Sequence, residues 1–164
     1  MIRHIAFIGL GSNLDEPREQ LQRAFIDLDK LPDTRLLKQS SLYESAPIGY
    51  LDQPNFVNAV AQLSTALTPR ALLQGLLQIE HAHGRERAFH NAPRTLDLDL
   101  LLYDEVQLHE HGLTIPHPQM HLRAFVLQPL LEIAPDCDIP AIGRVETALY
   151  LCRNQALERL ADVL

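Results

Sequence analysis

The segment APRTLDLDLLLYD, residues 92–104, decides the fold because it combines a strand pattern with two carboxylates. Successive side chains of a β-strand point to opposite faces, so residues 95–103 are predicted to form a strand. Asp97 and Asp99 would then share one face, with Cα atoms about 6.5 Å apart. The other face would carry the alternating leucines, which are Leu96, Leu98, Leu100 and Leu102.

Upstream of this strand, the chain alternates between strand and helix patterns. Residues 4–10 are an apolar, β-branched run closed by glycines, and helical spacing of apolar residues follows from Pro17 to the stop at 32–33. Residues 35–44 and 56–65 are predicted to be two more strands. Thr68 and the proline after it are typical of a helix start, and an apolar stripe then runs to Gly84. The order β-α-β-β-α-β predicts an α/β (α+β) fold with a ferredoxin-like antiparallel sheet.

Downstream of residue 104, three further elements are expected. A proline-rich turn occupies 116–118, a helical stretch lies near 121–134, and an amphipathic C-terminal helix is predicted from about 144 to 162. No linker or repeat divides the chain, so residues 1–164 are expected to form a single domain.

Composition limits the possible partners. The net charge of −7 argues against nonspecific binding to nucleic acid, which requires a basic surface that displaces counterions. The longest apolar runs are far shorter than the roughly 18 residues of a membrane span. Cys137 and Cys152 have no metal-finger spacing and fit a reducing compartment. We therefore expect a cytoplasmic monomer that binds neither nucleic acid nor membranes.

The acidic pair has arginines close to it in the sequence. Arg85, Arg87 and Arg94 precede Asp97 and Asp99 within a short, broken segment. Magnesium takes oxygen ligands and commonly uses one or two carboxylates plus substrate phosphates, which arginine forks also bind. The pattern therefore indicates a metal–nucleotide site. A solvated sheet face beside an arginine-rich loop is the structural alternative.

The glycines of FIGLGSN, residues 7–13, follow a strand and precede a helix. They do not make a dinucleotide fingerprint, because the third glycine of that motif would fall at Leu14, and no P-loop lysine follows. We predict instead that the glycines allow the first strand to pack tightly against the first helix.

Two close pairs among the eight histidines, His81 with His83 and His109 with His111, raise the alternative of a zinc site. Surface or capping roles are favoured, because no cysteine or carboxylate has matching ligand spacing. His117 differs from the others because it lies between Pro116 and Pro118, which form a rigid turn, and Arg123 follows shortly afterwards. Contact between His117 and a phosphate is therefore plausible.

Four segments together resemble the 6-hydroxymethyl-7,8-dihydropterin pyrophosphokinase family. They are IAFIGLGSNL at 5–14, LYESAPIGYLDQPNFVNAV at 42–60, IEHAHGRERAFHNAPRTLDLDLLLYD at 79–104 and LTIPHPQMHLRAFVLQPLLEIAPD at 113–136. The resemblance implies a ferredoxin-like fold and transfer of pyrophosphate from ATP to the hydroxymethyl group of a reduced pterin, with release of AMP, in folate biosynthesis. It also implies two magnesium ions.

The resemblance implies roles for individual residues. Asp97 and Asp99 match the family's metal ligands and, with Arg85 and Arg94, its catalytic set. The matching ATP-binding positions are Glu80, Arg85, Arg94, His117 and Arg123. The matching pterin-binding positions are Ser45, Ala46, Ile48, Phe56, Asn58 and Phe125. For both phenylalanines, simple core packing is the alternative.

The chain departs from the family pattern at two places. The chain has no tryptophan, whereas many members carry one in the loop before the position of Arg94. Phe89 is our candidate for the second aromatic that covers the pterin, and a solvent-facing Phe89 is the alternative. Pro118 replaces a frequent tyrosine, which removes one possible nucleotide contact.

Two other functions share parts of this pattern. An RNA-recognition domain has the same strand and helix order, but it would need exposed aromatic residues on its central strands and a basic face. A two-metal phosphohydrolase could use the same carboxylates and arginines, and it would hydrolyse ATP without pterin.

Overall fold

The computed structural model describes residues 2–84 and 95–161, and within them it has the predicted α+β order. Along the chain the elements form two consecutive groups. The first group contains β1 (His4–Ser12), α1 (Pro17–Asp29), β2 (Thr34–Gln39), β3 (Tyr43–Ser45), β4 (Phe56–Thr65), α2 (Pro69–Ala82) and β5 (Asp97–Tyr103). The second contains β6 (Leu108–Glu110), β7 (Leu113–Ile115), the short 3-10 helix η1 (Met120–Leu122), α3 (Ala124–Ile133), β8 (Asp138–Ile139), β9 (Gly143–Arg144), α4 (Val145–Leu151) and β10 (Leu157–Arg159).

The main sheet is antiparallel and has the order β10-β3-β4-β1-β5, with β2 also paired to β4. When β2 and β3 are counted as one interrupted strand, the chain has four main strands, which are β1, β2 with β3, β4 and β5. Their order across the sheet is that of a ferredoxin-like fold. The fold class predicted from the sequence is therefore confirmed. None of the helices in the described residues is long and apolar enough to cross a membrane.

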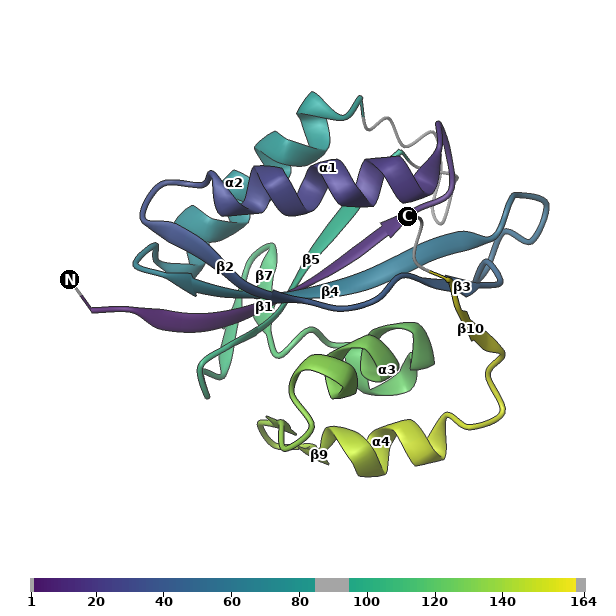
Figure 1. Cartoon of the computed structure of the whole chain (residues 1–164). Coiled ribbons are helices and arrows are strands. Elements are labelled where there is room, and N and C mark those ends of the chain that lie inside the picture. Colours follow the sequence, from purple (N-terminus) through teal and green to yellow (C-terminus); the bar gives the residue numbers. More distant parts are fainter. Residues whose placement is uncertain (1, 85–94, 162–164) are drawn as a thin grey trace.

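Helices cover both faces of this sheet. Figure 1 shows α1 and α2 on one side and α3 and α4 on the other. Alternation along β1 explains the two layers, because Ile8 and Leu10 face the core under α1 and α2, whereas Phe7 faces the core over α3. Both cores consist mainly of fully buried aliphatic side chains.

Local signals define the ends of α2. Thr68 is the N-cap, and its hydroxyl oxygen accepts a hydrogen bond from Ala71 N at 3.1 Å. At the other end Gly84 has φ +76°, a left-handed conformation that glycine adopts without strain, and its N–H donates to His81 O at 3.0 Å. Both predicted boundaries of this helix are therefore confirmed.

The predicted alternation along β5 fails at its second half. A β-bulge lies opposite β1, since Phe7 pairs with Leu102 but the next residue, Ile8, pairs with Leu100. The extra residue is Leu101, and it turns Leu102 to the α3 face, whereas Leu100 stays in the core under α1 and α2. The prediction that Leu102 packs beside Leu100 was wrong for this reason.

The predicted strand at 35–44 is broken into β2 and β3. Ser40 replaces regular pairing at the break, because its hydroxyl accepts a hydrogen bond from Val60 N at 2.9 Å while its own N–H donates to Val60 O. Next to it, Ser41 N and Oγ donate to the carboxylate of Glu132 in α3, which also accepts from Tyr43 Oη at 2.6 Å. Side-chain hydrogen bonds therefore redirect the chain at this point.

The predicted C-terminal helix at 144–162 was also wrong. Helix α4 ends at Leu151, and residues 157–159 form β10, which pairs with β3. The unpaired edge of β3 offers backbone partners that helical periodicity in the sequence cannot reveal. Gln155, between the two elements, also caps α3, because its Oε1 accepts from Ala124 N at 2.9 Å.

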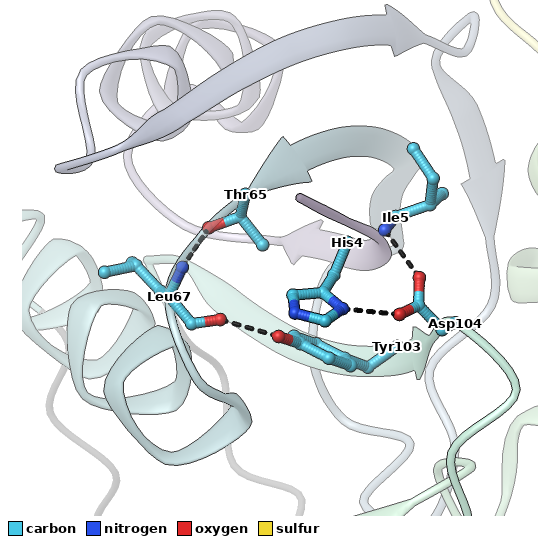
Figure 2. Close-up of polar contacts among 6 residues, drawn as sticks. All are labelled: His4, Ile5, Thr65, Leu67, Tyr103 and Asp104. Atoms are coloured by element: carbon cyan, nitrogen blue, oxygen red, sulfur yellow. Dashed lines mark hydrogen bonds and ion pairs between the residues drawn. The ribbon is translucent and has the colours of Figure 1, made fainter. Parts of the chain in front are cut away.

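A polar cluster joins β1, β4 and β5 at the end of the sheet where β1 begins (Figure 2). Asp104 accepts hydrogen bonds from Ile5 N at 2.8 Å and from His4 Nδ1 at 2.6 Å. The ring of His4 stacks on Tyr103, whose hydroxyl donates to Leu67 O at 2.7 Å. These contacts hold the start of β1 in register, while its other end forms the site described next.

Candidate active site

A pocket opens on the α3 face of the sheet, at the end of β1, and encloses about 650 Å³ of space that opens to solvent. This size suits a small molecule. Nine of the residues proposed from the sequence line it: Ser45, Ala46, Ile48, Phe56, Asn58, Asp97, Asp99, Arg123 and Phe125. They come from β3, β4, β5, α3 and adjoining loops, so the fold brings together residues that are far apart in the chain.

The floor of this pocket is made by two glycines of β1. Gly9 pairs with Asp99 and Gly11 with Asp97, and directly paired residues share a face of the sheet. A Cβ at Gly11 would lie 3.6 Å from Asn58 Oδ1, on the pocket side. The prediction that these glycines pack against the first helix was therefore wrong, because they lie on the face opposite to α1 and leave the pocket open.

The two aspartates share the pocket face, as the alternation in the sequence predicted. Asp97 and Asp99 are half-buried, and the leucine between them, Leu98, is buried on the other face. Behind the pair, the buried carboxylate of Glu80 accepts a hydrogen bond from Leu98 N at 2.7 Å. Glu80 thus connects α2 to β5, the strand that carries both aspartates.

The donor set of this acidic pair fits magnesium. Carboxylate oxygens are the hard ligands that magnesium prefers, and one or two of them are usually completed by water and substrate phosphates. In the described part of the chain, no group of three or more His, Cys, Asp or Glu side chains could hold a metal.

Asn58 offers a hydrogen-bond acceptor to the pocket. Its Nδ2 donates to Ser45 Oγ at 2.7 Å and lies 3.4 Å from the carbonyl oxygens of Tyr43 and Phe56. Because carbonyl oxygens only accept, they fix the nitrogen on that side and place Oδ1 above Gly11. This side chain is only 3% exposed, so its orientation is set before any ligand binds.

Aromatic and cationic groups lie beside this amide. Phe56 and Phe125 are both half-buried and both line the pocket, which distinguishes them from ordinary core residues. The guanidinium carbon of Arg123 lies 5.6 Å from the centre of the Phe125 ring. An apolar ring face and a fixed positive charge are therefore neighbours in one site.

His117 lies next to the acidic pair but does not line the pocket. Its Nδ1 accepts a hydrogen bond from Gln119 N, and its Nε2 is 4.0 Å from Asp99 Oδ1. Burial and, to a smaller extent, the positive charge of Arg123 together lower the pKa of His117 to about 4, although the negative charge of Asp97 opposes the shift. At neutral pH the ring is therefore uncharged and carries its hydrogen on Nε2, directed toward the aspartates.

Arg85 and Arg94 lie outside the described residues, as does Phe89, so their predicted roles stay predictions. The sequence reasoning also missed residues that the pocket uses. Gly9 and Gly11 could have been recognised, since glycines two residues apart in a strand leave one face without side chains. Asn13, which follows β1 and is 2% exposed, does not line the pocket but hydrogen-bonds to the loop after β3, and it had no distinctive sequence signal.

Comparison with known protein families identifies one match. Residues 7–135 match the family described as 7,8-dihydro-6-hydroxymethylpterin-pyrophosphokinase. The chain is 48% identical over 160 residues to the 2-amino-4-hydroxy-6-hydroxymethyldihydropteridine pyrophosphokinase of Pseudomonas aeruginosa, with 98% of each chain covered. It is 49% identical over 135 residues to the protein of that name from Haemophilus influenzae, covering 82% of this chain and 84% of that one.

Solved structures support the fold. The chain superimposes on a crystal structure of an HPPK-DHPS protein in complex with substrates with a TM-score of 0.77, at 13% identity, covering 99% of this chain and 47% of that one. For wild-type HPPK-DHPS of Plasmodium falciparum the TM-score is 0.70, at 13% identity, covering 92% and 45%. The chain thus spans about half the length of these solved proteins.

Proposed function

This chain belongs to the 7,8-dihydro-6-hydroxymethylpterin-pyrophosphokinase family, and on that basis we propose how its pocket performs the reaction. The chain transfers pyrophosphate from its co-substrate ATP to the hydroxymethyl group of 6-hydroxymethyl-7,8-dihydropterin and releases AMP, a step of folate biosynthesis. One observation carries the proposed mechanism: Asp97, Gly11 and Asn58 lie in one cross-strand row, so an anionic group and an amide flank an open floor.

The pterin is proposed to lie above Gly11. Asn58 Oδ1 would accept a hydrogen bond from a donor on the ring edge, and the backbone around Ser45, Ala46 and Ile48 would meet the same edge. The rings of Phe56 and Phe125 would contact the faces of the pterin. The hydroxymethyl group would then point along the floor toward β5.

ATP is proposed to lie on the β5 side of the pocket. Asp97 and Asp99 would hold two magnesium ions, which neutralise charge on the phosphate oxygens when bound. Arg123 and the Nε2 hydrogen of His117 would contact phosphates, and the sequence adds Arg85 and Arg94. Glu80, which the family resemblance assigns to ATP, would lie beside the nucleotide and also hold Leu98 in place through its hydrogen bond.

The proposed reaction is an in-line displacement. The hydroxymethyl oxygen attacks the β-phosphorus, the bond from that phosphorus to the oxygen shared with the α-phosphate breaks, and AMP departs with this oxygen. Either Asp97 or a water molecule would accept the proton of the hydroxymethyl group. The chain contributes chiefly by holding the two substrates on adjacent parts of one rigid floor.

We further infer that residues 1–164 act as a single catalytic domain, as a monomer, in the cytoplasm. Both cysteines, Cys137 and Cys152, are free, which fits a reducing compartment. Neither nucleic acid nor a membrane is proposed as a partner.

Incubation of the purified chain with Mg-ATP and the reduced pterin alcohol tests the function. We expect AMP and the pterin pyrophosphate in equal amounts, and neither without the pterin. Release of ADP or phosphate from ATP alone would instead identify a phosphohydrolase. Replacing magnesium with a chelator is expected to stop turnover, and full activity in excess chelator would contradict the metal proposal.

Asn58→Ala and Phe125→Ala are expected to weaken binding of a pterin analogue by about tenfold or more, because each removes one directional contact. Calorimetric titration with a nonhydrolysable ATP analogue and magnesium present measures the dissociation constant. Leu151→Ala, at an exposed position in α4, is the control and should bind normally. Unchanged affinity in both pocket variants would mean that the pterin lies elsewhere.

A further inference from the structure

Asn13 connects the end of β1 to the loop between β3 and β4. Its Nδ2 donates one hydrogen bond to Gln53 Oε1 at 2.8 Å and another to Pro54 O at 3.0 Å. An amide nitrogen carries two hydrogens, so both donors of Asn13 bind the same loop. The side chain is 2% exposed, although its partners are about forty positions away in the sequence.

The hydrogen bonds continue within the loop. Gln53 accepts from Asn13 through Oε1, and its Nε2 donates to Tyr50 O at 2.5 Å. Both ends of the Gln53 amide are therefore used, and exchanging them would put a donor against the donor of Asn13. This connection extends from β1 to the middle of the loop.

The loop has little apolar packing of its own. Ile48 is 51% exposed and Leu51 is 73% exposed, so burial of these side chains contributes little to its position. Yet Ala46 and Ile48, which follow β3, line the pocket, and β4 and β1 separate β3 from β5, which carries Asp97 and Asp99. The position of this loop therefore depends more on hydrogen bonds, such as those of Asn13, than the positions of the core strands do.

We propose that Asn13 is a positioning residue for the pterin: it holds residues 46–55 at the distance from the floor that the pterin ring requires. Asn13 follows Gly11 by two residues, so one short segment supplies both the pocket floor and the anchor of the wall. This inference rests on the proposed function. It assigns Asn13 to the pterin and not to ATP, because the anchored loop lies away from the acidic pair.

Kinetics of Asn13→Ala test this role. We expect KM for the pterin to rise about tenfold, the factor that corresponds to the net loss of one or two hydrogen bonds, with KM for ATP and kcat changed by less than about threefold. Asn13→Asp keeps the size but removes both donors and sets a carboxylate against two oxygen acceptors, so its effect should be larger. Asn55→Ala is the matched control, because this asparagine of the same loop donates instead to Glu44 Oε1 at an exposed position.

A double-mutant cycle keeps the test valid if Asn13→Ala alone lowers stability. Gln53→Ala should also raise KM for the pterin. In the double variant, the total rise in KM should be smaller than the product of the rises in the two single variants, because both substitutions remove the same hydrogen bond. The dissociation constant of a pterin analogue, measured by calorimetry, should follow the same pattern.

The proposal is overturned if Asn13→Ala and Gln53→Ala have the same KM for the pterin as Asn55→Ala, or if KM for ATP rises as much as KM for the pterin. Lack of AMP formation by the wild-type chain would instead refute the proposed function itself.

Discussion

Asp97→Asn and Asp99→Asn are each expected to lower kcat by about a hundredfold or more while the chain stays folded. The substitution keeps the size of the side chain but removes a negative charge from the pocket face that would hold magnesium. Both side chains are half-buried and reach the pocket, so neither is required by the core. Steady-state rates with saturating ATP and pterin measure the loss, and circular dichroism reports the fold.

The control for this experiment is Asp136→Asn. That carboxylate is 98% exposed and pairs only at 3.8 Å with Arg144, so its loss should leave the rate unchanged. A second readout is the magnesium dependence of turnover, which should shift to higher concentration in the two pocket variants alone. Rates within a few-fold of wild type in either variant would mean that the pair is only a polar sheet face.

Gly11→Val is expected to raise KM for the pterin by about a hundredfold or more, with little loss of stability. A Cβ at Gly11 would stand on the pocket floor between Asp97 and Asn58, and the two methyl groups of valine would fill the space above it. The nearest atoms to that Cβ are Asn58 Oδ1 at 3.6 Å and a Phe56 ring carbon at 3.9 Å, which are ordinary contacts. Valine is also common in β-strands, so we expect the backbone of β1 to keep its conformation.

Gly11→Ala tests whether the rise in KM depends on the size of the side chain at this position. It adds one carbon and should give a smaller rise in KM than valine, whereas thermal unfolding should occur within a few degrees of wild type in both. A steric effect must grow with side-chain size. Equal KM values for glycine, alanine and valine at this position would show that the pterin does not lie on β1.

Much of the fold could be predicted because its signals are local. The N-cap Thr68 and the C-terminal Gly84 define α2 through contacts within a few residues, and the alternation around Asp97 and Asp99 follows from strand geometry alone. The family resemblance then grouped distant residues into one site. Nine of those residues line the pocket, while Glu80 and His117 lie beside it.

The errors occurred where a residue's partner is distant in the chain. Leu102 changes face because β1 pairs with a bulged β5, and residues 157–159 form a strand because β3 has an open edge. Hydrophobic periodicity reports which residues avoid water, but it does not identify the element that covers them.

Periodic burial, capping and the acidic strand were thus readable in the chain itself, and with the family resemblance they were enough to predict an antiparallel α+β fold and a pyrophosphokinase site. Packing in three dimensions settled which face the glycines leave open, which face each half of β5 presents, and that Asn13 hydrogen-bonds to Gln53 in the loop after β3. The reason is physical. A cap or an alternating strand is stabilised by neighbours in sequence, whereas a pocket is a space between segments whose distance and orientation depend on every layer of the fold.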